Sequence, residues 1–113
     1  MQTRTAVDQE RLGQVLGQAV ADMGAALNGA LVMIGAELGL WEALAGAGPL
    51  TSDDIAERSG VAERYVREWS SAQAASGYLE YDPDHDTFLL APEQAMAFAA
   101  EDSPVYMLSL IHI

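Results

Sequence analysis

The sequence predicts a mainly α-helical protein, in which a helical N-terminal dimerisation region precedes a winged helix-turn-helix with one small β-hairpin. Three observations lead to this fold class. Apolar residues recur at three- and four-residue steps through the N-terminal part of the chain. Two short helical patterns follow, one on each side of Gly60, and after Gly77 the apolar period changes to two. Helix, turn, helix and hairpin in this order form a winged helix-turn-helix.

The first helical segment begins after Asp8, a residue type that caps helix N-termini, and Glu10 lies in the first turn, where the helix dipole favours an acid. From Ala30 to Trp41 nearly every face is apolar, so this part should be buried on all sides. A chain of 113 residues offers little protein to cover it. We therefore expect a homodimer through the N-terminal helices, or a further domain. The apolar stripe that precedes this part consists of Leu12, Val15, Leu16, Ala19, Val20, Met23 and Leu27.

Small residues four positions apart support close packing of helices in this region. Such a spacing places both members of a pair on one helix face, where a missing side chain lets another helix approach. The alternative is that each glycine only weakens its helix, by up to about 1 kcal/mol. The pairs are Gly13 and Gly17, Ala26 and Ala30, and Gly35 and Gly39.

We predict a cytoplasmic protein that does not contact a membrane. The N-terminal stretch has no apolar core followed by a small-residue cleavage site, so it does not read as a secretory signal. Only 14 uncharged residues separate Asp22 from Glu37, with Asn28 among them, whereas a membrane span needs about 20. A buried helix of a soluble protein is the better interpretation.

The helix-turn-helix is predicted from its stop and start signals. A short helix from Leu40 to Ala45 runs into the glycine-rich "GAGP", and Thr51 or Ser52 caps the next helix, whose first residues are acidic. Gly60 ends that helix in the left-handed conformation. The second helix of the motif extends from residue 62 to residue 76, with apolar positions at Tyr65, Val66, Trp69, Ala72 and Gln73/Ala74.

The wing and the last helix follow Gly77. "YLEY" and "TFLL" flank the turn "DPDHD", which indicates a β-hairpin. Pro92 then opens a final helix, "PEQAMAFAAED", because proline suits the first helical position. We divide the chain into a helical dimerisation region (1–50), a winged-helix subdomain (51–100) and a linker (101–113). The composition shifts abruptly at Leu108–Ile113, "LSLIHI", which we expect not to belong to the native protein.

Charge argues against DNA binding. The chain carries a formal charge of −12, with five arginines and no lysine, whereas affinity for the phosphate backbone comes mainly from basic side chains. Between Thr51 and Ala91 three arginines stand against nine acids. Arg64 and Arg67 are flanked by Glu63 and Glu68, so local ion pairs would neutralise them. A docked helix needs phosphate contacts before it reads bases, and we expect no nucleic-acid partner.

No catalytic, cofactor-binding or metal-ligating residue is predicted in this chain. The absence of cysteine excludes disulfides and thiolate zinc sites. His85 lies in the turn and His112 near the end, with no nucleophile beside either. Trp41, Trp69, Tyr78 and Phe88 are expected in the core. The run Asp82, Asp84, Asp86 and Glu93 has calcium-loop spacing, but Thr87 replaces the required glycine and the flanks are strand-like.

From Leu27 to Met107 the sequence resembles the N-terminal winged-helix domain of bacterial class I S-adenosylmethionine-dependent methyltransferases. "GLWEALA", "GPLT" and "IAERSGV" carry the general likeness, and "ERYVREW" with "YDP" carries a narrower one. The resemblance implies a domain that mediates dimerisation and roofs the substrate pocket of a Rossmann-like domain following it. It also implies S-adenosylmethionine as the cofactor of a full-length parent with a small-molecule methyl acceptor.

The cofactor-binding signature of that class is not found in this chain. Gly46 and Gly48 form the only close glycine pair, but no β-rich run precedes them and Pro49 follows. A loop between helices is the better interpretation. We therefore expect a dimerisation and substrate-cap fragment that is not catalytic by itself. The alternative is a small winged-helix transcription regulator that binds DNA.

Overall fold

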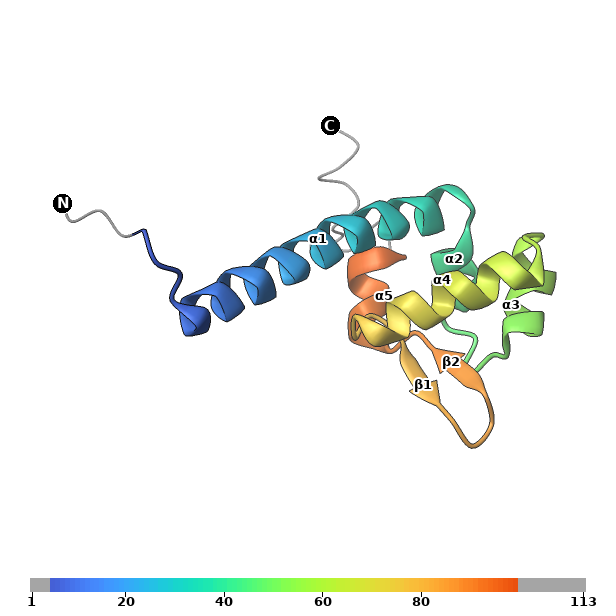
Figure 1. Cartoon of the computed structure of the whole chain (residues 1–113). Coiled ribbons are helices and arrows are strands. Elements are labelled where there is room, and N and C mark those ends of the chain that lie inside the picture. Colours follow the sequence, from blue (N-terminus) through green and yellow to red (C-terminus); the bar gives the residue numbers. More distant parts are fainter. Residues whose placement is uncertain (1–4, 100–113) are drawn as a thin grey trace.

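The computed structural model describes residues 5–99, and the predicted linker and tail at 101–113, including Leu108–Ile113, lie outside the described residues. Within them the protein is mainly helical with one small antiparallel hairpin, which confirms the predicted fold class (Figure 1). The elements are α1 (Gln9–Glu37), α2 (Leu40–Leu44), α3 (Ser52–Ser59), α4 (Glu63–Ala75), β1 (Glu80–Asp82), β2 (Thr87–Leu89) and α5 (Pro92–Phe98).

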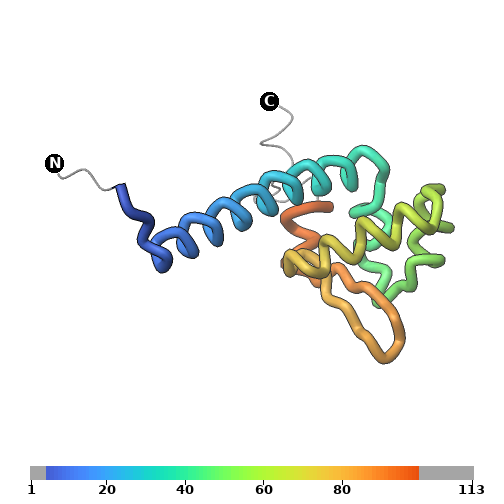
Figure 2. The backbone as a smooth tube through the Cα atoms, viewed as in Figure 1, coloured from blue at the N-terminus to red at the C-terminus, as the bar shows by residue number. Residues whose placement is uncertain are grey.

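Helix α1 is one continuous helix of 29 residues. It begins at the predicted cap, where Asp8 Oδ1 accepts hydrogen bonds from the backbone amides of Glu10 at 3.0 Å and Arg11 at 3.3 Å. Its N-terminal half projects away from the rest of the protein (Figure 2). Its C-terminal half packs on α2 and α4. The N-terminal half of α1 is therefore exposed to solvent, whereas its C-terminal half packs on the rest of the protein.

The prediction that the Ala30–Trp41 stretch needs a second subunit to cover it differs from the structure. Val32, Leu40 and Trp41 are buried by the chain's own winged helix, so the Ala30–Trp41 stretch is partly covered without a second subunit. The bare part is the apolar stripe before it, where even Met23 is 72% exposed. The reason is that α2 and α4 both pack on α1 near its C-terminal end (Figure 1).

By length and composition alone, α1 is also apolar enough to cross a membrane. Its side opposite the stripe carries Gln14 and Gln18, both exposed. A helix in lipid is apolar on every face, whereas an amphipathic helix has one apolar side. The described part of α1 thus has the amphipathic pattern in its projecting half.

Of the predicted glycine pairs, only one member makes a close contact. A β-carbon on Gly35 would lie 2.4 Å from the indole ring of Trp69, so α1 and the Trp69 side chain meet only because this side chain is missing. Gly39 has a φ of +74° and stands after the end of α1, so it does not share a helix face with Gly35. Gly13 and Gly17 have no neighbour within 4 Å.

The helix-turn-helix forms at the predicted residues. Thr51 and Asp54 make a reciprocal capping box at the start of α3, with each side chain 3.1 Å from the other residue's backbone nitrogen. Gly60 ends α3 with a φ of +78°, the left-handed cap that the sequence predicted. Helix α4 spans Glu63–Ala75, one residue shorter at each end than predicted.

The two-stranded wing carries one bridging residue, Leu50, that the sequence did not indicate. β1 and β2 pair antiparallel, with Tyr81 opposite Phe88. On the other side of β2, Leu50 exchanges backbone hydrogen bonds of 2.9 and 2.7 Å with Phe88. The loop before α3 is thereby fixed to the sheet. A single bridging residue has no periodicity, so no sequence pattern predicts it.

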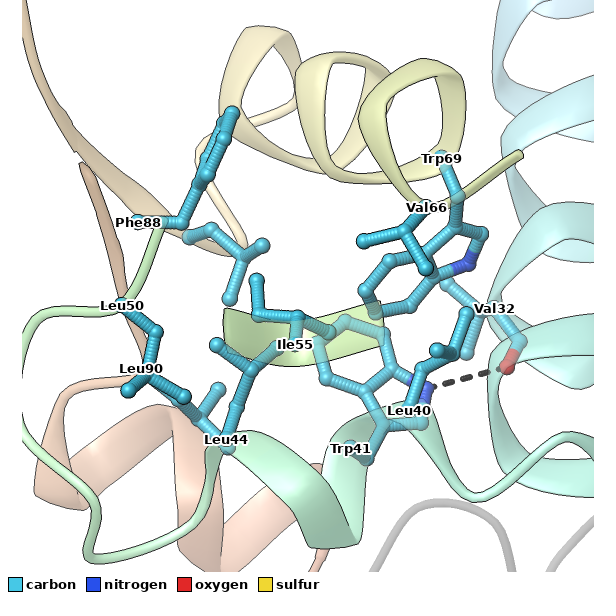
Figure 3. Close-up of a cluster of buried hydrophobic side chains, with 11 residues drawn as sticks. Val32, Leu40, Trp41, Leu44, Leu50, Ile55, Val66, Trp69, Phe88 and Leu90 are labelled. Atoms are coloured by element: carbon cyan, nitrogen blue, oxygen red, sulfur yellow. Dashed lines mark hydrogen bonds between the residues drawn. The ribbon is translucent and has the colours of Figure 1, made fainter. Parts of the chain in front are cut away.

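The core lies where α1, α2, α4 and the wing meet (Figure 3). Trp41 and Trp69 meet edge to face with ring centroids 4.7 Å apart. Both indoles donate hydrogen bonds to carbonyls of α1, Trp41 to Val32 at 3.0 Å and Trp69 to Leu31 at 2.8 Å. Phe98 of α5 stacks on Trp41 with centroids 4.6 Å apart. The two tryptophans therefore join the end of α1 to the winged helix.

Candidate functional site

Helix α4 holds the position of a recognition helix, and its solvent face carries Arg64, Tyr65, Arg67 and Glu68. Arg67 is paired within the helix, with its Nη2 2.9 Å from Glu63 Oε2. The same carboxylate accepts a 2.6 Å hydrogen bond from the Ser52 hydroxyl. The pKa of Glu63 is lowered, because the Ser52 hydroxyl and the Arg67 guanidinium both stabilise the charged form.

The other two arginines of the motif differ in their surroundings. The Nε of Arg58 donates a 2.8 Å hydrogen bond to the carbonyl of Ala43, so this side chain ties α3 to α2. Arg64 is exposed and makes no ion pair with any residue between 5 and 99. The predicted neutralisation by neighbouring glutamates is confirmed for Arg67, and Glu68 makes no such pair with Arg64 in this range.

The wing presents carboxylates beside this helix. Asp82 accepts hydrogen bonds from the backbone amide of Asp84 at 2.9 Å and pairs with His85 Nδ1 at 2.7 Å. These contacts, the His85 side chain first, lower the pKa of Asp82. Asp86 accepts a 2.8 Å hydrogen bond from the hydroxyl of Tyr81. The hairpin therefore keeps its charged aspartates in place by local hydrogen bonds, and its field repels phosphate.

The calcium-loop spacing does not correspond to a loop in space. Asp82, Asp84 and Asp86 lie in the hairpin and its turn, whereas Glu93 is in the first turn of α5. Among residues 5–99 no group of three or more His, Asp or Glu side chains is placed to hold a metal ion. Thr87 lies in β2, as its β-branched side chain suggested.

A hollow of about 580 Å³ with mixed polar and apolar lining lies between α4 and the wing. Arg67 and Asp86 are its charged lining residues, and Phe88 forms its apolar part. Because Arg67 is held by Glu63 and Asp86 by Tyr81, both charged groups already have partners. Ser52 also lines the hollow, and its hydroxyl donates to Glu63, a carboxylate whose lowered pKa makes it a weak base.

The most unusual surface is the bare side of α1, which we call the α1 apolar face. Its most exposed members are Val20 at 70%, Met23 at 72% and Leu27 at 65%. Monomeric soluble proteins seldom leave a continuous apolar strip of this kind in water. The α1 apolar face consists of Leu12, Val15, Leu16, Ala19, Val20, Met23, Leu27, Ile34 and Leu38.

This face continues into a groove of about 450 Å³ between α1 and α4. Leu27, Ile34 and Leu38 belong to both the face and the groove. Tyr65 of α4 is 68% exposed at the groove edge. The sequence placed Tyr65 among the apolar positions of this helix, but unlike Val66 and Trp69 it is not buried. The α1–α4 groove is lined by Leu27, Leu31, Ile34, Leu38, Leu40, Val61, Tyr65, Glu68, Trp69 and Ala72.

The structure also tests the positions predicted for four aromatic residues and for two glycines of the α2–α3 loop. Trp41, Trp69 and Phe88 are buried, which confirms them as core residues, whereas Tyr78 is 38% exposed against Phe98. Gly46 and Gly48 lie in the loop between α2 and α3, as predicted, both with positive φ. The groove was missed because it depends on how α1 packs against α4.

The model of the Rv2258c-like winged HTH domain matches residues 25–100. No curated protein sequence matches the chain. The matched stretch begins inside α1 and includes every later element that the structure describes. The N-terminal half of α1, with most of its apolar face, precedes the matched stretch.

Proposed function

The chain belongs to this family of Rv2258c-like winged HTH domains, and from that membership we propose that it uses the winged-helix shape for protein contacts. In this proposal it is the dimerisation and substrate-cap part of an S-adenosylmethionine-dependent methyltransferase. The observation that carries the proposal is the α1 apolar face, which no described part of the chain covers. Burial of an apolar surface of this kind is a main driving force for association.

The surface charge of the helix-turn-helix supports the same conclusion. DNA-binding winged helices need cations along the recognition helix and the wing, to contact phosphates and fix the docking. Here Arg67 is neutralised by Glu63, and the wing carries three aspartates. Arg64 is the cation on the α4 face that has no such partner among the described residues. One arginine offers little affinity against a chain charge of −12.

The methyltransferase assignment rests on the sequence resemblance of "ERYVREW" and "YDP". In methyltransferases of that type the cofactor is bound by a Rossmann-like domain, and the winged helix covers the substrate pocket. No residue of this chain takes over a catalytic or cofactor-binding role in the proposal. The methyl acceptor would be a small molecule bound under the cap.

Two measurements test this proposal. Calorimetry of the chain with S-adenosylmethionine should give no binding heat, and a low-micromolar Kd would contradict it. Sequencing the source gene beyond the codon of Met107 should reveal a β-rich segment that ends in a glycine-rich turn. A stop codon at this point in the genomic DNA would refute the methyltransferase assignment.

A DNA-binding regulator is the second candidate, and the exposed Arg64 on α4 favours it. Fluorescence anisotropy with duplex DNA at low salt distinguishes the two. For the proposed function, binding should be immeasurable at micromolar protein. For a regulator, affinity should fall steeply with salt, by a log–log slope of about −0.9 for each phosphate contacted. Arg64→Ala should then weaken binding, while Arg58→Ala, on the α2–α3 contact, serves as a comparison outside the α4 face.

A further inference from the structure

We propose that two copies of the chain pair antiparallel along α1, so that the N-terminal half of each α1 covers the partner's C-terminal half and enters its α1–α4 groove. The inference rests on the proposed dimerisation and adds the partner, the direction and the register. It commits to a second copy of this chain as the occupant of the α1 apolar face. Three properties of the described residues carry it.

The first property is the extent of the apolar face, which begins at Leu12 and ends at Leu38. In a two-fold symmetric contact the same surface occurs on both sides, so each residue must meet a residue of the same face. An antiparallel pair covers the whole face only if the two-fold symmetry axis lies midway between Leu12 and Leu38, level with Ala25. This register places Leu12 opposite the partner's Leu38 and Leu16 opposite the partner's Ile34.

The second property is the groove at one end of the face. In this register Leu12 and Leu16 arrive beside the α1–α4 groove of the partner, which is apolar and open to solvent. Tyr65, exposed at the groove edge, would then gain an apolar neighbour. The residues from Leu12 to Leu38 span about 39 Å of helix at 1.5 Å per residue. A strip about 10 Å wide along that length covers about 400 Å², and apolar patches of this size are often functional.

The third property is the placement of charge at the two ends of α1. Glu37 is exposed beside the C-terminal end of the face, and Arg11 is exposed at its N-terminal end. In the antiparallel register these two side chains lie on the same flank, within two residues of each other along the axis. A parallel pair would instead bring Arg11 beside Arg11 and Glu37 beside Glu37. Opposite charges therefore favour the antiparallel direction.

Disulfide cross-linking tests the register directly, because the chain contains no cysteine. We expect that mild oxidation of a mixture of Leu16→Cys and Ile34→Cys chains gives a mixed disulfide dimer. Each variant alone should remain uncrosslinked. A mixture of Gln14→Cys and Ile34→Cys chains is the matched control, since Gln14 lies on the polar side of α1 and should not react.

A charge exchange tests the direction in solution. Arg11→Glu should weaken the dimer by about 2- to 30-fold, the range for two symmetry-related surface ion pairs. Combining it with Glu37→Arg in the same chain should restore most of the affinity. Gln14→Glu, which adds a negative charge close to Arg11 in sequence but on the polar side of α1, should not reproduce the effect of Arg11→Glu.

The experimental outcomes distinguish a failure of dimerisation from a failure of the antiparallel register. Sedimentation that shows a monomer at micromolar concentration would refute both the dimerisation and the register, and a monomer that floats with neutral lipid vesicles would assign the face to a membrane. A stable dimer in which Leu16→Cys alone cross-links would refute only the antiparallel register and leave dimerisation standing. Mixed cross-linking together with charge rescue would support the inference.

Discussion

Replacing Gly35 by alanine should destabilise the fold, although alanine is the better helix former. A β-carbon at this position would lie 2.4 Å from Cζ2 of Trp69 and 2.9 Å from Nε1 of Trp41. Both rings are held by hydrogen bonds to α1 and by each other, so they have little room to retreat. Overpacking of this kind costs about 1–3 kcal/mol.

Two further contributions decide the net effect. Loss of one indole hydrogen bond would add about 1 kcal/mol to the cost. Alanine would recover about 1 kcal/mol through its helix propensity. We therefore expect Gly35→Ala to lower the free energy of unfolding by about 1–3 kcal/mol.

Urea unfolding followed by far-ultraviolet circular dichroism, at one fixed protein concentration, measures this change. Gly29→Ala is the matched control, because Gly29 is in the same helix and has nothing within 4 Å of an added β-carbon. The control should stabilise the protein by up to about 1 kcal/mol. If Gly35→Ala shifted the midpoint upward as Gly29→Ala does, the close approach of α1 to Trp69 would be disproved.

Three other changes test the local structure. Thr51→Ala removes half of the capping box with Asp54 and should cost about 1 kcal/mol in a denaturant titration, while an unchanged midpoint would count against the box. Gln73→Ala leaves a cavity and breaks the 3.0 Å hydrogen bond to α1, which should cost about 2–3 kcal/mol by the same assay. The lowered pKa of Glu63 means that its contribution to stability is present above the unfolded-state pKa and is lost as the pH falls through the folded value. Ser52→Ala should raise the pKa of Glu63 toward its ordinary value in an NMR titration, and an unmoved pKa would show that the Ser52 hydrogen bond is unimportant.

The helix-turn-helix and wing could be predicted because their signals are local. A capping threonine, a left-handed glycine and a change of period each act within a few residues, and Thr51, Gly60 and Gly77 all have the predicted roles. The long helix was read correctly at its start for the same reason, since Asp8 caps it. Local chemistry thus determines where these elements begin and end.

What the sequence did not reveal depends on packing between distant segments. The exposure of Tyr65 follows from the path that α1 takes past α4. The structural role of Arg58 requires that the Ala43 carbonyl be nearby, which no spacing indicates. The bridge at Leu50 is a single residue without periodicity. The division of the chain at residue 50 stays a prediction, although α2 shares the core with later elements.

The edge-to-face pair of tryptophans gives the protein an optical property of its own. These are the only two tryptophans in the chain, and both indoles rest against the last turns of α1. Their electronic transitions lie close enough, at 4.7 Å between centroids, to couple and split. Because hydrogen bonds to α1 orient both rings, we expect the resulting exciton bands to weaken when α1 detaches, even if every helix survives. Spectroscopy of the unlabelled chain can therefore follow release of α1 separately from the melting of its helices.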